Sequence, residues 1–190
     1  VNILSAARLF LFAARDVWFV IALPVFLASQ LDWEHSSVGA FLALWVIAYG
    51  AVQSIAPALT ARKTAPDGKV ATVWAGLLML VTALLTVTIY TAWIAPQVAL
   101  IVGLMVFGAA FAINSSLHSY LIVSYAGDDG VSLDIGFYYM ANAMGRLVGT
   151  ILSGWVYQVA GLGACLAIST FMLLLTWLIS FKLPRKKASC

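Results

Sequence analysis

Two charged residues, Arg15 and Asp16, interrupt the apolar run LFLFAARDVWFVIALPVFLA near the start of the chain. A guanidinium binds carboxylates and other oxyanions through its forked N–H groups, and a carboxylate either neutralises a nearby cation or carries a proton. A second arginine, Arg146, lies in another apolar run, FYYMANAMGRLVGTILSGW. These three residues are the strongest candidates for chemistry, because a charge in such surroundings needs a partner.

The composition explains why the surroundings are apolar. Of the 190 residues, 64% are hydrophobic and only 9% are charged, and the mean hydropathy is +1.03. Ten basic and seven acidic residues cannot cover the surface of a water-soluble domain of this length. The composition therefore indicates an integral membrane protein.

Six apolar stretches are long enough to cross a membrane, which takes about 20 helical residues. They run approximately over Ile3 to Ser29, Ser37 to Leu59, Val70 to Ile94, Val98 to Tyr125, Ile135 to Val159 and Leu162 to Leu183. Turn-forming and charged segments separate them. The sequence thus predicts an all-α bundle of six transmembrane helices over residues 1–184, followed by a basic tail, 185–190.

The distribution of Lys and Arg predicts the orientation of these helices. Arg62, Lys63 and Lys69 lie between the second and third spans, on the same face as the basic tail, whereas the loops of the opposite face contain no Lys or Arg. Positively charged loops stay in the cytoplasm, so we expect both ends there. Because the chain begins with Val1 and enters an apolar segment at once, we also expect it to be a fragment that lacks an N-terminal part.

Polar residues are unevenly shared among the six spans. The third and sixth spans have no ionisable group in their middles and are expected to face lipid. The other four carry strongly polar residues, which are Arg8, Arg15, Asp16, Gln53, Asn114, His118, Asn142 and Arg146. Two polar helices followed by one apolar helix, repeated twice, is the pattern of helix triplets around a wet cavity.

The two arginines lie deep in their helices. At about 1.5 Å per residue, Arg15 is about 18 Å and Arg146 about 17 Å from the cytoplasmic ends of their spans, and His118 is about 10 Å from its own. A charge near the midplane costs at least about 2.5 kcal/mol unless it is paired or hydrated. Two arginines outnumber the single carboxylate at this depth, and a substrate anion could balance the surplus.

Spacing separates the faces of the fifth span. Tyr138, Asn142 and Arg146 recur every four residues and share one stripe. A neighbouring stripe of small residues, Ala141, Gly145, Gly149 and Ser153, allows another helix to approach closely. We expect the small stripe to pack and the polar stripe to face the cavity.

The role of Asp16 has two interpretations. Side chains at adjacent positions point about 100° apart, so Arg15 and Asp16 are expected to meet partners on other helices. Asp16 is then either a structural counter-ion, of Arg8 or Arg146, or a group that couples transport to protons.

Enzyme motifs are missing from the sequence. It contains no HExxH metal motif, no phosphate-binding glycine loop and no supported Ser/His/Asp set. Cys165 and Cys190 lie far apart and suggest neither a disulfide nor a metal site. We therefore expect no catalytic activity, no cofactor, no metal and no nucleic-acid partner.

Long strings of the sequence resemble a known family. These are LSAARLFLFAARDVWFVIALPVFL, FLALWVIAYGAVQSIAP, INSSLHSYLIVSY and DGVSLDIGFYYMANAMGRLVGTILSGWVYQ. They are similar to the C-terminal half of the ArsJ organoarsenical efflux permeases of the major facilitator superfamily. The resemblance implies helices seven to twelve of a twelve-helix transporter whose N-terminal half is missing. The superfamily's Gly-x-x-x-Asp-Arg loop motif is degenerate, because Pro57 and Ala61 replace its Gly and Asp and only Arg62 matches.

The resemblance also implies a function. Such permeases reside in the bacterial inner membrane and export 1-arseno-3-phosphoglycerate, an ester made when glyceraldehyde-3-phosphate dehydrogenase uses arsenate. They thereby confer arsenate resistance and depend functionally on that enzyme. The alternatives are a permease for another organic anion and a non-transporting membrane scaffold or sensor.

The arginines fit such a substrate, because a guanidinium suits oxyanions. We expect an alternating-access exporter in which Arg15 and Arg146 clamp the anion. Asp16 or His118 would couple transport to protons. The residues expected to add hydrogen bonds to the substrate are Gln53, Asn114, His118, Tyr138 and Asn142.

Overall fold

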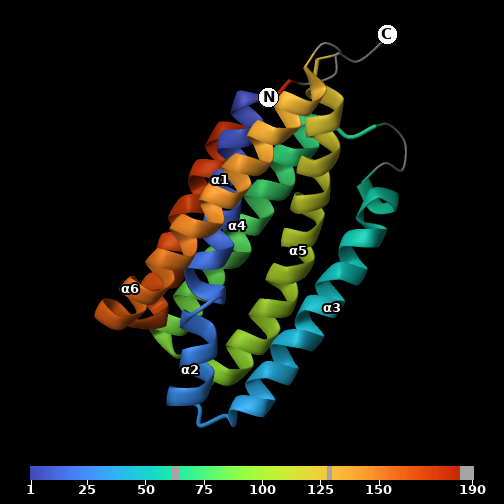
Figure 1. The fold of residues 1–190 in the computed structure, drawn as a ribbon. Helices are drawn as coiled ribbons and strands as arrows, with labels where there is room; N and C mark the ends of the chain where they lie inside the picture. The colour runs from blue at the N-terminus through green and yellow to red at the C-terminus, as the bar shows by residue number, and fades with distance from the viewer. Residues whose placement is uncertain (61–64, 128–129, 185–190) are drawn as a thin grey trace.

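The computed structural model describes residues 1–60, 65–127 and 130–184, and Figure 1 shows helices throughout this part of the chain. They are α1 (Asn2–Phe19), α2 (Ala22–Gln30), α3 (His35–Thr60), α4 (Gly68–Thr91), α5 (Pro96–Tyr125) and α6 (Val131–Ser180). The all-α prediction is confirmed. Arg62, Lys63 and the basic tail 185–190, which carry much of the orientation argument, lie outside the described residues, as does Ala61 of the loop motif.

Within the described ranges, five helical stretches are long and apolar enough to cross a membrane, and not the six that the sequence predicts. The difference lies in α6, which joins the expected fifth and sixth spans into 50 residues. Gly161 is non-helical, with φ 74° and ψ −175°. The Sγ of Cys165 lies 3.9 Å from the carbonyl oxygen of Ser153, although twelve residues of straight helix span about 18 Å. Helix α6 therefore folds back into two arms, residues 131–160 and 162–180.

The first expected span is broken into α1 and α2. The interruption falls at Val20 and Ile21, just before Pro24. Proline has no backbone N–H, so the carbonyl four residues earlier, that of Val20, loses its helical partner. The break therefore follows from a single residue of the sequence.

The first arm of α6 packs tightly along α1 (Figure 1). A Cβ on Gly145 would collide with the Leu9 carbonyl oxygen, and a Cβ on Gly149 would lie 2.7 Å from that of Ala13. Such backbone-to-backbone proximity is possible only for residues without a side chain. The prediction that the small stripe packs is confirmed.

The remaining helices build outward from this pair. Helix α4 packs between α5 and the second arm of α6, where the Thr72 hydroxyl donates to the Ser180 carbonyl oxygen. The outer side of α4 shows an exposed apolar stripe, as expected for a lipid-facing helix: Val73, Leu77, Leu80, Leu84 and Val87. Helix α3 forms the edge, packs mainly on α5 and leaves most of its length exposed (Figure 1).

The two ends of the described chain lie at the same end of the bundle. Leu4 of α1, Leu121 of α5 and Leu183 belong to one buried cluster. The Gly68 N–H, at the start of α4, donates to the Pro184 carbonyl oxygen at 3.1 Å. This arrangement agrees with an even number of crossings.

Candidate functional site

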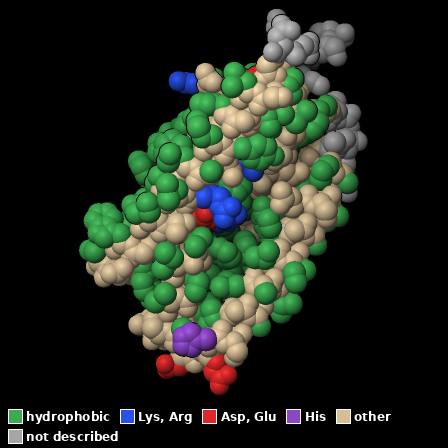
Figure 2. Space-filling model, viewed as in Figure 1, with side chains coloured by type: hydrophobic (Ala, Val, Ile, Leu, Met, Phe, Trp, Pro, Cys, Tyr) green, Lys and Arg blue, Asp and Glu red, His purple; other side chains and the backbone are tan. Residues whose placement is uncertain are grey.

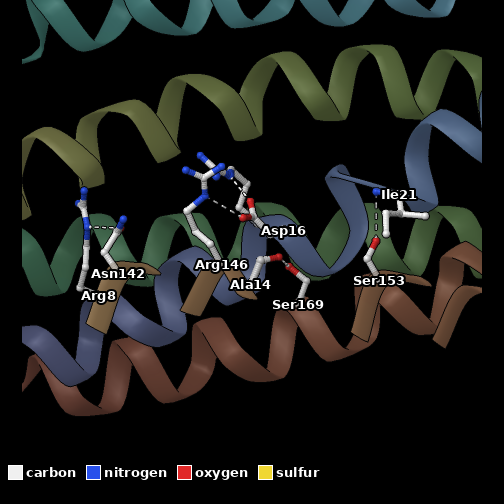
Figure 3. A network of polar contacts seen from close by, with 9 residues as sticks. Arg8, Ala14, Asp16, Ile21, Asn142, Arg146, Ser153 and Ser169 are labelled. Atoms are coloured by element: carbon white, nitrogen blue, oxygen red, sulfur yellow. Dashed lines mark hydrogen bonds and ion pairs between the residues drawn. The ribbon is translucent and has the colours of Figure 1, made fainter. Parts of the chain in front are cut away.

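Asp16 joins two arginines from different helices. Its Oδ1 accepts from the Nε of Arg15 at 2.6 Å, and its Oδ2 accepts from the Nε of Arg146 at 3.3 Å. Arg15 and Asp16 come from α1, and Arg146 comes from the first arm of α6. Figure 3 shows Arg146 and Asp16 pointing toward each other. Both carboxylate oxygens are thus committed, and the carboxylate is fully buried.

The expectation that Arg15 and Asp16 meet partners on other helices is confirmed for Asp16, which pairs with Arg146 of α6, and is wrong for Arg15, which pairs with Asp16 itself. Adjacent Cβ atoms do diverge by about 100°, but the arginine side chain is long enough to turn back and place its Nε on the neighbouring carboxylate. Of the two counter-ion partners considered for Asp16, the structure gives Arg146 and not Arg8.

The two arginines keep their outer nitrogens available. Among the described residues, neither Arg15 nor Arg146 uses an Nη nitrogen in a hydrogen bond. The Arg146 side chain is 58% exposed and that of Arg15 is 15% exposed. Figure 2 shows Lys or Arg side chains beside an Asp or Glu side chain in the middle of a largely apolar face. Two guanidiniums against one carboxylate leave a surplus positive charge beside free N–H donors.

Arg8 lies on the same helix, one heptad before Arg15, and is 5% exposed. Its Nε donates to the Oδ1 of Asn142 at 3.0 Å, and its Nη1 donates to the Ser115 carbonyl oxygen at 3.1 Å. Its guanidinium carbon lies 4.0 Å from the centre of the Phe12 ring. Within the described ranges no carboxylate pairs with Arg8. It is a buried cation held by neutral groups and by an aromatic ring.

Asn142 and Tyr138 therefore act on Arg8 in this structure. The Arg8 guanidinium carbon lies 5.1 Å from the centre of the Tyr138 ring, and Tyr138 is fully buried. The predicted polar stripe of the fifth span thus has two parts. Tyr138 and Asn142 hold Arg8, whereas Arg146 contacts Asp16 and leaves the rest of its side chain exposed.

Three other predicted residues lie apart from the arginine pair. The Asn114 amide is fully buried, and its Nδ2 donates to the carbonyl oxygen of Trp74 on α4 at 2.9 Å. His118 is fully buried, and neither ring nitrogen has a partner in the described part of the chain. Gln53 is half-buried on α3. The structure brings none of the three into contact with Arg15 or Arg146.

Serine hydroxyls support the backbone beside the site. The Ser153 Oγ accepts from the N–H groups of Ile21 at 3.3 Å and Ala22 at 3.1 Å, where α1 breaks (Figure 3). The Ser169 hydroxyl donates to the Ala14 carbonyl oxygen at 2.6 Å. A buried N–H without a partner is costly, so these contacts stabilise the break and hold the segment that bears Arg15 and Asp16.

Sequence reasoning named Arg8 as an ionisable residue and did not assign it to the site. Its heptad spacing from Arg15 was the available signal. Ser115 and Ser169 were missed, because a serine in an apolar helix usually bonds to its own backbone. Nothing in the spacing distinguishes these serines from the rest.

Two guanidiniums that are aligned by one buried carboxylate and keep their outer nitrogens for a ligand are suited to bind an oxyanion inside a membrane protein. A comparison with protein families identifies the class of protein to which the chain belongs. The model described as Major Facilitator Superfamily matches residues 4–189. The chain belongs to the major facilitator superfamily. Members of this superfamily are permeases and not enzymes, so the chain serves the transport of small molecules across a membrane. Comparison with curated proteins gives no significant match.

Membership of the major facilitator superfamily agrees with the described helices, whose five stretches of spanning length make a multi-pass protein. It also accounts for charged residues deep in apolar helices, because such residues in transporters mark substrate or ion pathways.

Proposed function

We propose that this superfamily member is part of an alternating-access exporter for an organic oxyanion, with Arg15 and Arg146 as its anion ligands. The observation that carries the proposal is the sharing of Asp16. Each arginine gives its Nε to one carboxylate oxygen. Their Nη groups remain for a ligand, and a phosphate or carboxylate binds such forks in a bidentate manner.

The proposed architecture is the C-terminal half of a twelve-helix transporter. The fold-back of α6 at Gly161 supports six crossings, since each arm is long enough to span the hydrocarbon core. The small-residue contact between α1 and α6 supports a rigid unit that moves as a body against the other half. We propose that both ends face the cytoplasm of a bacterial inner membrane.

Asp16 has the role of counter-ion to Arg15 and Arg146. Its two contacts neutralise part of the charge of the arginines, so an arriving anion competes with the carboxylate for them. Protonation of Asp16 would free both guanidiniums, and this would couple substrate binding to proton movement. His118, whose buried ring nitrogens have no partner among the described residues, is the second candidate for carrying that proton.

The remaining predicted residues contribute in two ways. Asn142 and Tyr138 hold Arg8 as a second cationic group behind the pair. Gln53, Asn114 and His118 would reach a substrate only after the helices rearrange during transport. We therefore assign primary binding to the arginines, secondary hydrogen bonds to Gln53, Asn114 and His118, and the support of Arg8 to Asn142 and Tyr138.

The substrate we propose is 1-arseno-3-phosphoglycerate, with glyceraldehyde-3-phosphate dehydrogenase as its source. This follows from the resemblance to the ArsJ permeases, and the surplus positive charge of the site fits a molecule that bears several anionic groups. A different organic anion would satisfy the same geometry.

The test uses cells that lack other arsenic exporters and express the full-length transporter with the dehydrogenase. We expect the wild-type protein to confer arsenate resistance and Arg146→Gln to abolish it at equal membrane abundance. Lys182→Gln, a change of an exposed cation at the bundle end, serves as the control and should retain resistance. Full resistance with Arg146→Gln would exclude the arginine clamp.

A non-transporting scaffold or sensor predicts another outcome. In that case the polar groups only connect helices, and Arg146→Gln would lower the amount of folded protein without changing transport per molecule. Uptake measured per reconstituted protein in liposomes separates the two functions.

A further inference from the structure

We propose that a row of aromatic rings beside Arg15 makes the site prefer organic anions that carry a planar ring. This inference rests on the anion-binding role proposed for Arg15 and Arg146. It names a second ligand class for the same site, ring-bearing oxyanions, which charge alone does not select and to which the acyclic ester proposed above does not belong.

The row begins at the guanidinium itself. The guanidinium carbon of Arg15 lies 4.9 Å from the centre of the Phe12 ring and 5.2 Å from that of Phe111. The ring of Phe111 lies 6.0 Å from that of Tyr49 on α3. The cation therefore stands at one end of a set of rings contributed by α1, α3 and α5.

The row continues along α3 toward the break in α1. Tyr49 stacks on Trp45, with ring centres 5.6 Å apart and an angle of 18° between the planes. Trp45 in turn lies 4.5 Å from the ring of Phe19, the last residue of α1. The rings thus form an uninterrupted series from Arg15 to Phe19.

Burial divides the series into supporting and available rings. Phe12, Phe111 and Trp45 are buried. The Nε1 of Trp45 donates to the Leu104 carbonyl oxygen at 2.9 Å, which fixes the indole. Tyr49 is half-buried, and its hydroxyl makes no hydrogen bond among the described residues. A fixed indole therefore supports a phenol ring that still has free surface.

Phe19 is likewise half-buried, which gives the row a second partly free ring. The combination of a cation and adjacent free ring surface favours one kind of ligand. Its anionic group would bind the Nη nitrogens of Arg15 and Arg146, and its ring would stack against Tyr49. Aromatic rings attract each other beyond the effect of buried area, so a ring should add affinity that an acyclic anion lacks.

The experiment measures equilibrium binding to the purified full-length transporter in nanodiscs, with empty nanodiscs as background. The probes are methylphosphonate, cyclohexylphosphonate and phenylphosphonate, which share the anionic group and differ in the substituent. We expect phenylphosphonate to bind about tenfold more tightly than methylphosphonate, and more tightly than cyclohexylphosphonate. Tyr49→Leu and Phe19→Leu should each reduce this preference, Tyr49→Leu to less than about threefold.

The matched control is Phe171→Leu, which removes a ring that is exposed on the second arm of α6; it should keep the full preference. Equal affinity for the three phosphonates would overturn the ring selectivity and leave the anion site standing. A preference that survives in both Tyr49→Leu and Phe19→Leu, or cyclohexylphosphonate binding as well as phenylphosphonate, would also overturn it. Failure of all three to bind would overturn the proposed function as well.

Discussion

Arg146 donates its Nε to the Oδ2 of Asp16 at 3.3 Å, from a position 130 residues further along the chain. This contact joins the first arm of α6 to α1 at the level of the site. The Arg146 side chain is largely exposed, whereas Asp16 is fully buried. The buried carboxylate of Asp16 therefore fixes the guanidinium of Arg146, which remains exposed at the surface of the bundle.

Removing the shared carboxylate should destabilise the protein. Asp16→Asn leaves Arg15 without its counter-ion, and loss of one partner of a buried ion pair costs about 3–5 kcal/mol. We expect a lower unfolding temperature in nanodiscs. Phosphate should raise that temperature more in the variant than in the wild type, because a bound anion stabilises the folded state.

Asp32→Asn is the control for this change. Asp32 is exposed and has a φ of 52°, a conformation that Asn also tolerates, so this variant should unfold like the wild type. If Asp16→Asn were as stable as Asp32→Asn, the carboxylate would not hold the arginines together.

The close approach of α1 and α6 should be sensitive to a single methyl group. In Gly149→Ala the new Cβ would lie 2.7 Å from the Ala13 carbonyl oxygen and 2.9 Å from the Cβ of Asp16. Overpacking of this kind costs about 1–3 kcal/mol. Thermal unfolding of the purified variant measures the loss.

Gly136→Ala, on the same arm, has nothing within 4 Å of the new Cβ. It should leave stability unchanged or raise it, since alanine is the better helix former by about 1 kcal/mol. Equal stability of the two variants would show that the helices can separate without cost.

Ser153 should stabilise the break between α1 and α2. Ser153→Ala removes the oxygen that accepts from the Ile21 and Ala22 N–H groups. Leaving buried donors unsatisfied costs about 1–3 kcal/mol. Hydrogen exchange measured by mass spectrometry should show faster exchange in peptides that contain these two residues.

The control is Ser54→Ala, an exposed serine whose hydroxyl donates only to the Ala51 carbonyl oxygen within α3. Exchange around Ile21 should not change in that variant. Unchanged exchange in Ser153→Ala would mean that other groups accept hydrogen bonds from the Ile21 and Ala22 N–H groups.

Some of these features could be predicted from the sequence and others could not. The periodicity of α6 gave its packing stripe correctly, because Gly145 and Gly149 admit only close backbone contact. Pro24 accounts for the break in α1 by its missing N–H. The partners of the polar side chains are harder to predict, since spacing defines a face of a helix and not the helix that covers it.

Asn114 and Arg15 illustrate the difficulty. Asn114 was expected to face the substrate, but its amide donates to a carbonyl oxygen of α4, a neighbour that only the tertiary arrangement reveals. The diverging Cβ atoms of adjacent residues predict that Arg15 turns away from Asp16, but the long arginine side chain reaches back to the neighbouring carboxylate. The count of spans differed because Gly161 allows α6 to reverse without a loop.

The measurement that tests the central claim most directly is uptake by proteoliposomes that contain the full-length transporter. The probe is 3-phosphoglycerate, a stable anion with a phosphate and a carboxylate. We predict saturable uptake by the wild type and by Lys182→Gln, and a rate at least about tenfold lower for Arg15→Gln and Arg146→Gln, as expected for loss of a charge-assisted contact. Wild-type rates in correctly folded Arg15→Gln and Arg146→Gln proteins would contradict the claim that these arginines bind the transported anion.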